Sequence, residues 1–199
     1  MKSVTKQGVI ILENATQEFQ FRQIVALQQR NHLSSMTLED QSRSGFVYAR
    51  HTVEMLKAMS AILPQVIAVS GGEVIGYTLA MDESMKNYLS DLEPMFTVFD
   101  LCNYRGMPLK TYRYMVGGQV CIDEKFRGQG LISVLYHRTR ELVSDRYQLC
   151  VTEISSRNLV SLRAHQKIGF EVIHEYSDGD ENWKIVAWEF AVTPVMPEQ

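Results

Sequence analysis

Hydrophobic residues follow two different spacings along this chain, and the change between them predicts where strands and helices lie. Short apolar runs predict strands, at residues 8–12, 66–69, 74–80, 111–122, 147–154, 171–176 and 183–190. Apolar positions three and four residues apart predict helices, at residues 19–33, 53–63, 131–143 and 159–168. Gly169 and the apolar Phe170 provide a left-handed stop for the last helix. The order of the elements predicts a mixed α/β sheet with helices on both faces.

A glycine-rich loop, Arg127-Gly128-Gln129-Gly130-Leu131, connects the strand 111–122 to the helix 131–143. The first N–H groups of a helix have no intrahelical partner, and the helix dipole adds partial positive charge at that end. The loop is therefore predicted to be an anion cradle, with phosphates as the expected ligand.

Two familiar phosphate-binding motifs do not fit this loop. A P-loop continues with Lys and Ser or Thr after its last glycine, and neither residue type follows Gly130 directly. A dinucleotide-binding fingerprint has a third glycine where this chain has Ser133. The loop thus belongs to another class of phosphate site.

Composition limits the setting of that site. The chain has 199 residues, 45% of them hydrophobic, and we expect one domain over 1–199. The net charge of −3 argues against nucleic acid as a partner, and no apolar run is long enough to cross a membrane. The apolar run near the N-terminus is too short for a secretory signal, so we expect a cytoplasmic protein. Three unpaired cysteines fit a reducing compartment, and neither they nor the histidines have metal-ligand spacing.

A second motif follows the first after about 30 residues: Asn158-x-x-Ser161-Leu162-x-x-His165-x-x-x-Gly169-Phe170. Arg127 and Gly130 meet the pattern [Arg/Gln]-x-x-Gly-x-[Gly/Ala], although Ile132 stands where its last position asks for Gly or Ala. With both motifs in this order, residues 65–190 resemble the GNAT superfamily of acyl-CoA-dependent N-acyltransferases. Helix periodicity groups Ile132 with Leu135 and Tyr136, so its side chain is expected to pack on the sheet.

The resemblance implies a mostly antiparallel, twisted sheet of about six to seven strands with helices on both faces. It implies acetyl-CoA as co-substrate, no metal, and a primary amine of a small molecule or peptide as acceptor, in a monomer or a homodimer. It also implies a set of residues that bind coenzyme A: Val120, Cys121 and Ile122 along the pantetheine arm, Arg127, Gly128, Gln129, Gly130, Leu131, Ile132 and Ser133 at the pyrophosphate, and Asn158.

Asn158 and His165 are seven residues apart, which is two turns on one helix face and about 10 Å along the axis. His165 stands where many relatives carry a tyrosine thought to protonate the departing thiolate, and an imidazole is able to serve as such an acid. A histidine satisfied within the helix–sheet interface is an equal alternative. For Asn158 the alternative is a helix cap.

The general base is not evident in the sequence. The strand 111–122 contains no carboxylate, and Tyr112, Tyr114 and Glu153 are more often ordinary strand residues. An acidic segment at 82–103 and the acidic turn Asp178, Asp180 and Glu181 suit a cationic acceptor if they face the site. Two alternatives to an enzyme remain: an acyl-CoA sensor without turnover, which would lack acid and base, and an interaction domain that binds no coenzyme A.

Overall fold

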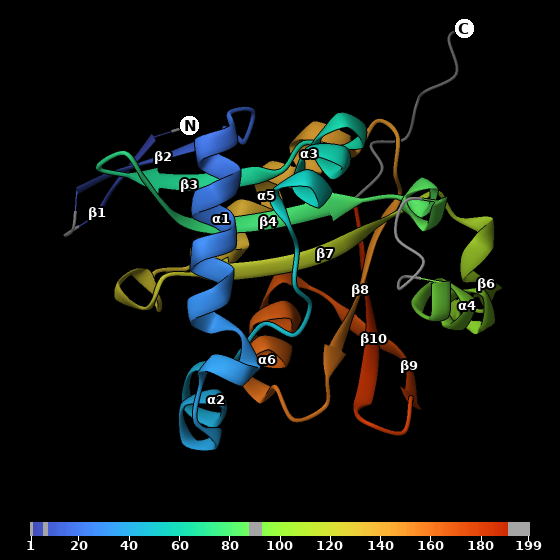
Figure 1. The fold of residues 1–199 in the computed structure, drawn as a ribbon. Coiled ribbons are helices and arrows are strands. Elements are labelled where there is room, and N and C mark those ends of the chain that lie inside the picture. The colour runs from blue at the N-terminus through green and yellow to red at the C-terminus, as the bar shows by residue number, and fades with distance from the viewer. Residues whose placement is uncertain (1, 6–7, 88–92, 191–199) are drawn as a thin grey trace, which may run out of the picture.

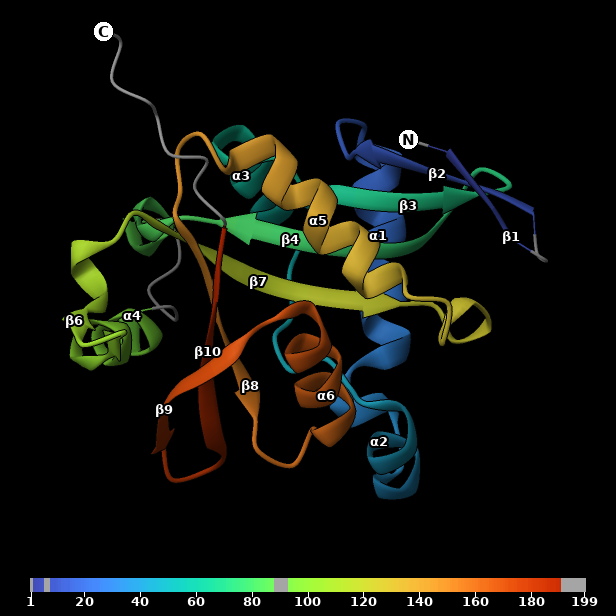
Figure 2. The same cartoon turned by 180° about the vertical axis from the view of Figure 1, so that it is seen from behind.

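The computed structural model describes residues 2–5, 8–87 and 93–190. In this part of the chain eight strands form one sheet in the order β1-β2-β3-β4-β7-β8-β10-β9 (Figures 1 and 2). Their bounds are β1 Lys2–Thr5, β2 Gly8–Asn14, β3 Val66–Ser70, β4 Glu73–Met81, β7 Tyr114–Ile122, β8 Leu149–Ser155, β9 Glu171–Ser177 and β10 Asn182–Glu189. Neighbours are antiparallel except β7 and β8, which are parallel. The predicted mixed, mostly antiparallel sheet is confirmed, and β1 adds an edge strand that the sequence did not predict.

Six α-helices are described, and they cover both faces of the sheet. Their bounds are α1 Glu18–Asn31, α2 Leu38–Ser44, α3 Val53–Ile62, α4 Glu93–Leu101, α5 Leu131–Val143 and α6 Leu159–Ile168. Helices α1 and α3 lie on one face, and α5 and α6 lie on the other (Figures 1 and 2). No described helix is long and apolar enough to cross a membrane.

Local sequence signals account for several of these boundaries. The β3–β4 hairpin turns at Gly71 and Gly72, whose φ angles of 59° and 84° lie in the region that glycine tolerates best. Thr52 caps α3 by accepting the Met55 N–H. Helix α6 ends at Gly169, at a φ of 114°, as its position in the sequence predicted.

Two helices do not follow from apolar spacing. Helix α2 has a polar sequence and is held by its Thr37 cap, which accepts the Asp40 N–H. Helix α4 lies with the short hairpin of β5 (Asn103–Tyr104) and β6 (Met107–Pro108) beside one end of the sheet (Figure 1). Met85, Met95, Phe96 and Phe99 of this segment are buried, whereas Leu101 and Met107 are exposed.

The course of β7 and β8 decides where a site can form. The two strands pair only from Tyr114 opposite Leu149 to Val116 opposite Val151. One residue later the Thr152 hydroxyl, rather than the β8 backbone, donates to the Gly117 carbonyl at 2.7 Å. Beyond this point the strands diverge, and the sheet opens into a V between them.

Candidate active site

The glycine-rich loop has the backbone that an anion cradle needs. Gly128 and Gly130 have φ angles of 74° and 75°, where a side chain would be strained, and a Cβ at either position would meet nothing within 4 Å. Gly130 is the N-cap of α5, and the first bond back to it comes from the Val134 N–H. The amides at the start of the helix therefore face an open space at its positive end.

Arg127 braces this loop. Its Nε donates to the Ile122 carbonyl at 3.1 Å, and its guanidinium donates to the Asn31 side chain on α1 at 2.5 Å. The side chain thus ties the end of β7 and helix α1 to the start of the loop. Ile132 is partly buried against the cores that contain Leu135 and Tyr136, as its periodicity predicted.

The strand that leads into the loop has one free edge. Val120, Cys121 and Ile122 pair with β4 through Thr78, Tyr77 and Gly76, whereas the ladder to β8 has ended at Val116. A bulge opposite Leu79 and Ala80 leaves Gly118 outside the β4 ladder. Burial raises the pKa of the Cys121 thiol to about 12, so Cys121 offers its backbone rather than a thiolate.

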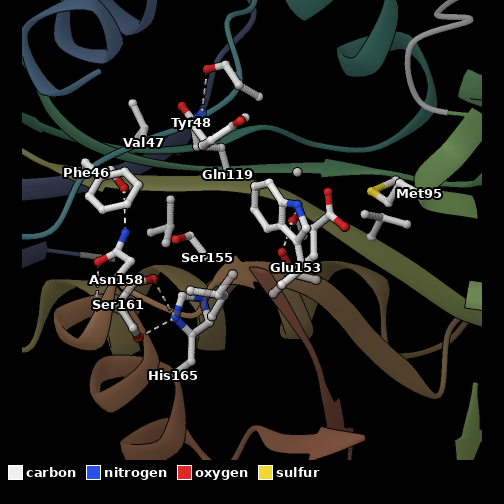
Figure 3. Close-up of a pocket in the computed structure, with 18 of the residues that line it drawn as sticks. Phe46, Val47, Tyr48, Met95, Gln119, Glu153, Ser155, Asn158, Ser161 and His165 are labelled. Atoms are coloured by element: carbon white, nitrogen blue, oxygen red, sulfur yellow. Dashed lines mark hydrogen bonds between the residues drawn. The ribbon is translucent and has the colours of Figure 1, made fainter. Parts of the chain in front are cut away.

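A cavity of about 150 Å³ occupies the V between β7 and β8 (Figure 3). Its walls come from the segment 46–51, the end of β4, helix α4, β7, β8 and α6, with Tyr136 and Trp183 closing the sides. Val120, Asn158 and His165 line it, so three of the predicted site residues meet there, while residues 127–133 lie beyond the end of β7. Among the described residues that line it there is no Lys or Arg, and Glu153 is the lone carboxylate.

His165 is buried and uses both ring nitrogens. Its Nδ1 lies 2.8 Å from the Ser161 carbonyl, so it donates, and its Nε2 therefore accepts from the Tyr136 hydroxyl at 2.8 Å. Burial lowers the pKa of His165 to about 4, which leaves the ring neutral at pH 7. These contacts favour a positioning role for His165, and its role as general acid stays a prediction.

Asn158 caps α6, with its Oδ1 accepting the Ser161 N–H at 3.2 Å. Its Nδ2 donates to the Phe46 carbonyl at 2.8 Å, which holds the segment 46–51 over the cavity. Asn158 lines the cavity in this role, and its binding of coenzyme A stays a prediction.

A chain of buried amides fixes a second histidine in the wall. The Gln28 Oε1 accepts the backbone N–H of His51 at 2.8 Å. The Gln28 Nε2 donates to the ring Nδ1 of His51 at 2.8 Å and to the Gln119 Oε1 at 2.9 Å. Because Nδ1 accepts, the neutral ring carries its proton on Nε2. Burial lowers the pKa of His51 to about 4, so this ring is a neutral hydrogen-bond donor rather than a base.

Glu153 is the cavity residue best suited to take up a proton. Burial raises the pKa of its carboxyl group, and the Tyr176 hydroxyl donates to it at 2.6 Å. Its position on β8 opposite Ile185 points this carboxylate into the V. Glu153 could not be distinguished from other strand residues in the sequence, because nothing local marks a cavity-facing position.

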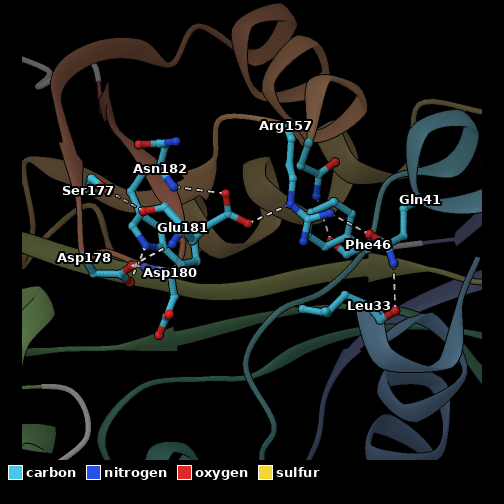
Figure 4. Close-up of polar contacts among 11 residues, drawn as sticks. Leu33, Gln41, Phe46, Arg157, Ser177, Asp178, Asp180, Glu181 and Asn182 are labelled. Carbon is cyan, nitrogen blue, oxygen red and sulfur yellow. Dashed lines mark hydrogen bonds and ion pairs between the residues drawn. The ribbon is translucent and has the colours of Figure 1, made fainter. Parts of the chain in front are cut away.

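The acidic turn between β9 and β10 makes a group of polar contacts next to Arg157 (Figure 4). Trp183 lines the cavity and donates from Nε1 to Asp178 at 2.8 Å. Glu181 pairs with Arg157 at 2.8 Å, and Arg157 also donates to Gln41 on α2. In contrast, the described acidic residues of 82–103 do not line the cavity. That segment contributes Met95 to the cavity wall.

Sequence reasoning did not find Tyr48, His51, Gln119, Tyr136 and Trp183 as site residues. In the sequence, each of them looks like an ordinary core or loop residue. Only the folding of distant segments around the V brings them together. Within the described ranges no group of three or more potential metal ligands gathers.

Comparison with known proteins defines the fold. Protein-family models and curated proteins gave no match to this sequence. Among solved structures, NAA60 from Arabidopsis thaliana in complex with acetyl-CoA aligns at a TM-score of 0.63 and 12% identity, over 91% of this chain and 99% of that one. The ribosomal-protein-S18-alanine N-acetyltransferase from Escherichia coli aligns at 0.58 and 12%, over 94% and 99%. An acetyltransferase of the GNAT family from Streptococcus pneumoniae aligns at 0.56 and 15%, over 90% and 98%.

This chain has the GNAT acetyltransferase fold. The match extends over nine tenths of the chain, well beyond the region 65–190 that carries the two sequence motifs. It includes the segments before β3, for which the sequence had given no specific indication. On this GNAT fold the V between β7 and β8 has the glycine-rich loop at one end and the cavity within it.

Proposed function

We propose that this protein transfers an acetyl group from acetyl-CoA to a primary amine. The observation that carries the proposal is the free edge of β7 after Val116, which connects the anion cradle at Gly128–Ser133 to the cavity. A pantetheine arm is able to add to such an edge as an extra strand. Its pyrophosphate would then lie at the start of α5 and its thioester in the V.

The reaction assigns a task to each part of the cavity. The amine nitrogen forms a bond to the acetyl carbon, the C–S bond breaks, and the amine loses a proton as the thiolate gains one. We assign Glu153 as the group that accepts the amine proton, because it is the carboxylate in the cavity and its pKa is raised. The bulged backbone at Gly118 supplies an amide outside the β4 ladder for the developing oxyanion.

The remaining predicted residues keep supporting roles in this scheme. Val120, Cys121 and Ile122 offer backbone groups to the pantetheine arm, and Arg127 holds the cradle to β7 and α1. Asn158 fixes the segment over the cavity, and the pair of His165 and Tyr136 shapes its donor side. The thiolate takes its proton from water, and Glu153 returns the amine proton to water, so both groups are restored for the next cycle; delivery of the thiolate's proton by His165 stays a prediction.

Binding of acetyl-CoA is tested by calorimetry with the variant Gly130→Asp. Asp and Asn both tolerate the left-handed backbone at this position, so Gly130→Asn is the matched control for strain and size. The added charge next to a pyrophosphate should weaken binding about ten-fold relative to Gly130→Asn, and less at high salt. Equal affinities in the two variants would overturn the assignment of the phosphate site.

Turnover separates an enzyme from a sensor. Release of free thiol from acetyl-CoA is measured with a panel of primary amines, for the wild type and for Glu153→Gln. The enzyme should release thiol only when an amine is present, and Glu153→Gln should lower kcat while leaving acetyl-CoA affinity unchanged. Tight binding of acetyl-CoA without thiol release for any amine would instead establish a sensor.

A further inference from the structure

The acceptor side of the cavity has a closed roof. Tyr48 and Trp183 meet edge to face with ring centroids 4.8 Å apart, joining the segment 46–51 to β10. Arg157 strengthens this closure: it pairs with Glu181, donates to Gln41 at 2.7 Å and lies over the Phe46 ring at 4.7 Å (Figure 4). An extended chain that ran through the cavity between the segment 46–51 and β10 would have to break these contacts. The roof therefore favours a compact acceptor that enters end-on.

The mouth of the cavity is negatively charged. Tyr48 lines the cavity and is 40% exposed, which places it at the opening. Burial raises the pKa of its hydroxyl, and the nearby negative charges of Asp178, Glu181 and Asp180 raise it further. Asp178 and Asp180 are both exposed, and Asp178 is committed to Trp183 and to two backbone N–H groups of the turn. In the part of the chain that the structure describes, neither Asp178, Asp180 nor Glu153 has a cationic partner within ion-pair distance.

The interior adds an independent sign of a missing ligand. Ser155 lines the cavity and is 3% exposed, and its Oγ lies near the Glu181 carboxylate but has no hydrogen-bond partner at ordinary geometry among the described residues. A buried hydroxyl without a partner is costly, so it marks a place where a polar ligand group completes the site. Between this interior and the mouth, the walls at Met81, Met95 and Trp183 are apolar.

Two carboxylate positions call for two amino groups. The amine that attacks the thioester must be uncharged when it reacts, so it cannot satisfy the carboxylate at the mouth as well. Resting on the proposed function, we propose that the acceptor is a compact aliphatic diamine, whose reacting amine lies near Glu153 and whose second, charged amine lies at Asp180. The apolar walls then contact the methylene chain that joins the two.

The test compares acceptors that differ only in the second charge. Thiol release is measured with diaminoalkanes from diaminopropane to diaminohexane, with the monoamines of equal length, and with short peptides that have a free N-terminus. We expect one diamine to have a kcat/KM at least about ten-fold above that of its monoamine. A monoamine as good as its diamine, or a peptide better than both, would overturn the proposal while leaving acetyl transfer intact.

The variant Asp180→Asn tests the position of the second charge. It should raise KM for the preferred diamine about three-fold, as expected for one exposed ion pair, and leave KM for the monoamine unchanged. Asp145→Asn, in the turn after α5, is the control for a lost exposed carboxylate. If Asp180→Asn and Asp145→Asn behave alike, the charge at the mouth does not bind the acceptor; if no amine releases thiol at all, it is the proposed function that fails.

Discussion

Burial of His51 and His165 should make this protein unfold in mild acid, and His32, whose pKa burial also lowers, acts in the same direction. His51 and His165 are 8% and 3% exposed, and burial lowers the pKa of each from 6.5 to about 4. Below pH 6.5 the unfolded chain binds protons that the folded chain excludes, so stability is fully present above pH 6.5 and is lost as the pH falls toward 4. The lowered pKa of each histidine costs about 3 kcal/mol of unfolding free energy once the pH has fallen through this whole range. At pH 5 the two histidines together cost about 4 kcal/mol. That is a large share of the roughly 5–15 kcal/mol that stabilises a typical domain.

The assay is urea unfolding followed by tryptophan fluorescence at several pH values between 7.5 and 5. His51→Gln and His165→Gln each remove one proton-binding site, so the decline of unfolding free energy should become shallower by up to about 1.4 kcal/mol per pH unit. Gln166→His, which adds an exposed histidine on α6, is the matched control and should keep the wild-type decline. The raised pKa of Glu153 acts in the opposite direction in every variant, so the comparison between variants is decisive. Declines as steep in His51→Gln and His165→Gln as in the wild type would refute the reasoning.

Two further sets of substitutions test the residues that hold the V and the glycine-rich loop in place. A Cβ at Gly76 would lie 2.6 Å from Ile122 Cδ1, so Gly76→Ala should lower the free energy of chemical unfolding by about 1–3 kcal/mol. Adding Ile122→Val removes that methyl group and should recover part of the loss. If the losses of the two single variants simply add in the double variant, the contact is contradicted. Arg127→Ala loses the bonds to Ile122 and Asn31 and should lower stability by about 1–3 kcal/mol together with acetyl-CoA affinity. Arg127→Lys keeps the charge but not the two-pronged geometry, so calorimetry should find affinity little restored; wild-type affinity would show that charge alone matters.

Local sequence signals determined most of the framework. Apolar spacing located α5 and α6 with their bounds, and glycines fixed the β3–β4 turn and the end of α6. The two motifs indicated the GNAT fold because they record local backbone requirements: a left-handed Gly130 before a helix, and an Asn158 cap with a Gly169 stop. Such requirements act within a few residues, so a single sequence is enough to reveal them.

Tertiary structure alone decided which side chains meet in the cavity. His51 lies far from Gln28 and Gln119 in sequence, yet hydrogen bonds among the three fix its proton on Nε2. Likewise burial keeps His165 neutral, and its tautomer agrees with the hydroxyl that Tyr136 donates from another helix. Charge state, tautomer and the choice of Glu153 as a cavity carboxylate depend on burial and on partners distant in sequence. The sequence by itself therefore determined the fold and predicted the anion cradle, whereas only the packing of strands and helices around the V decided which side chains meet in the cavity.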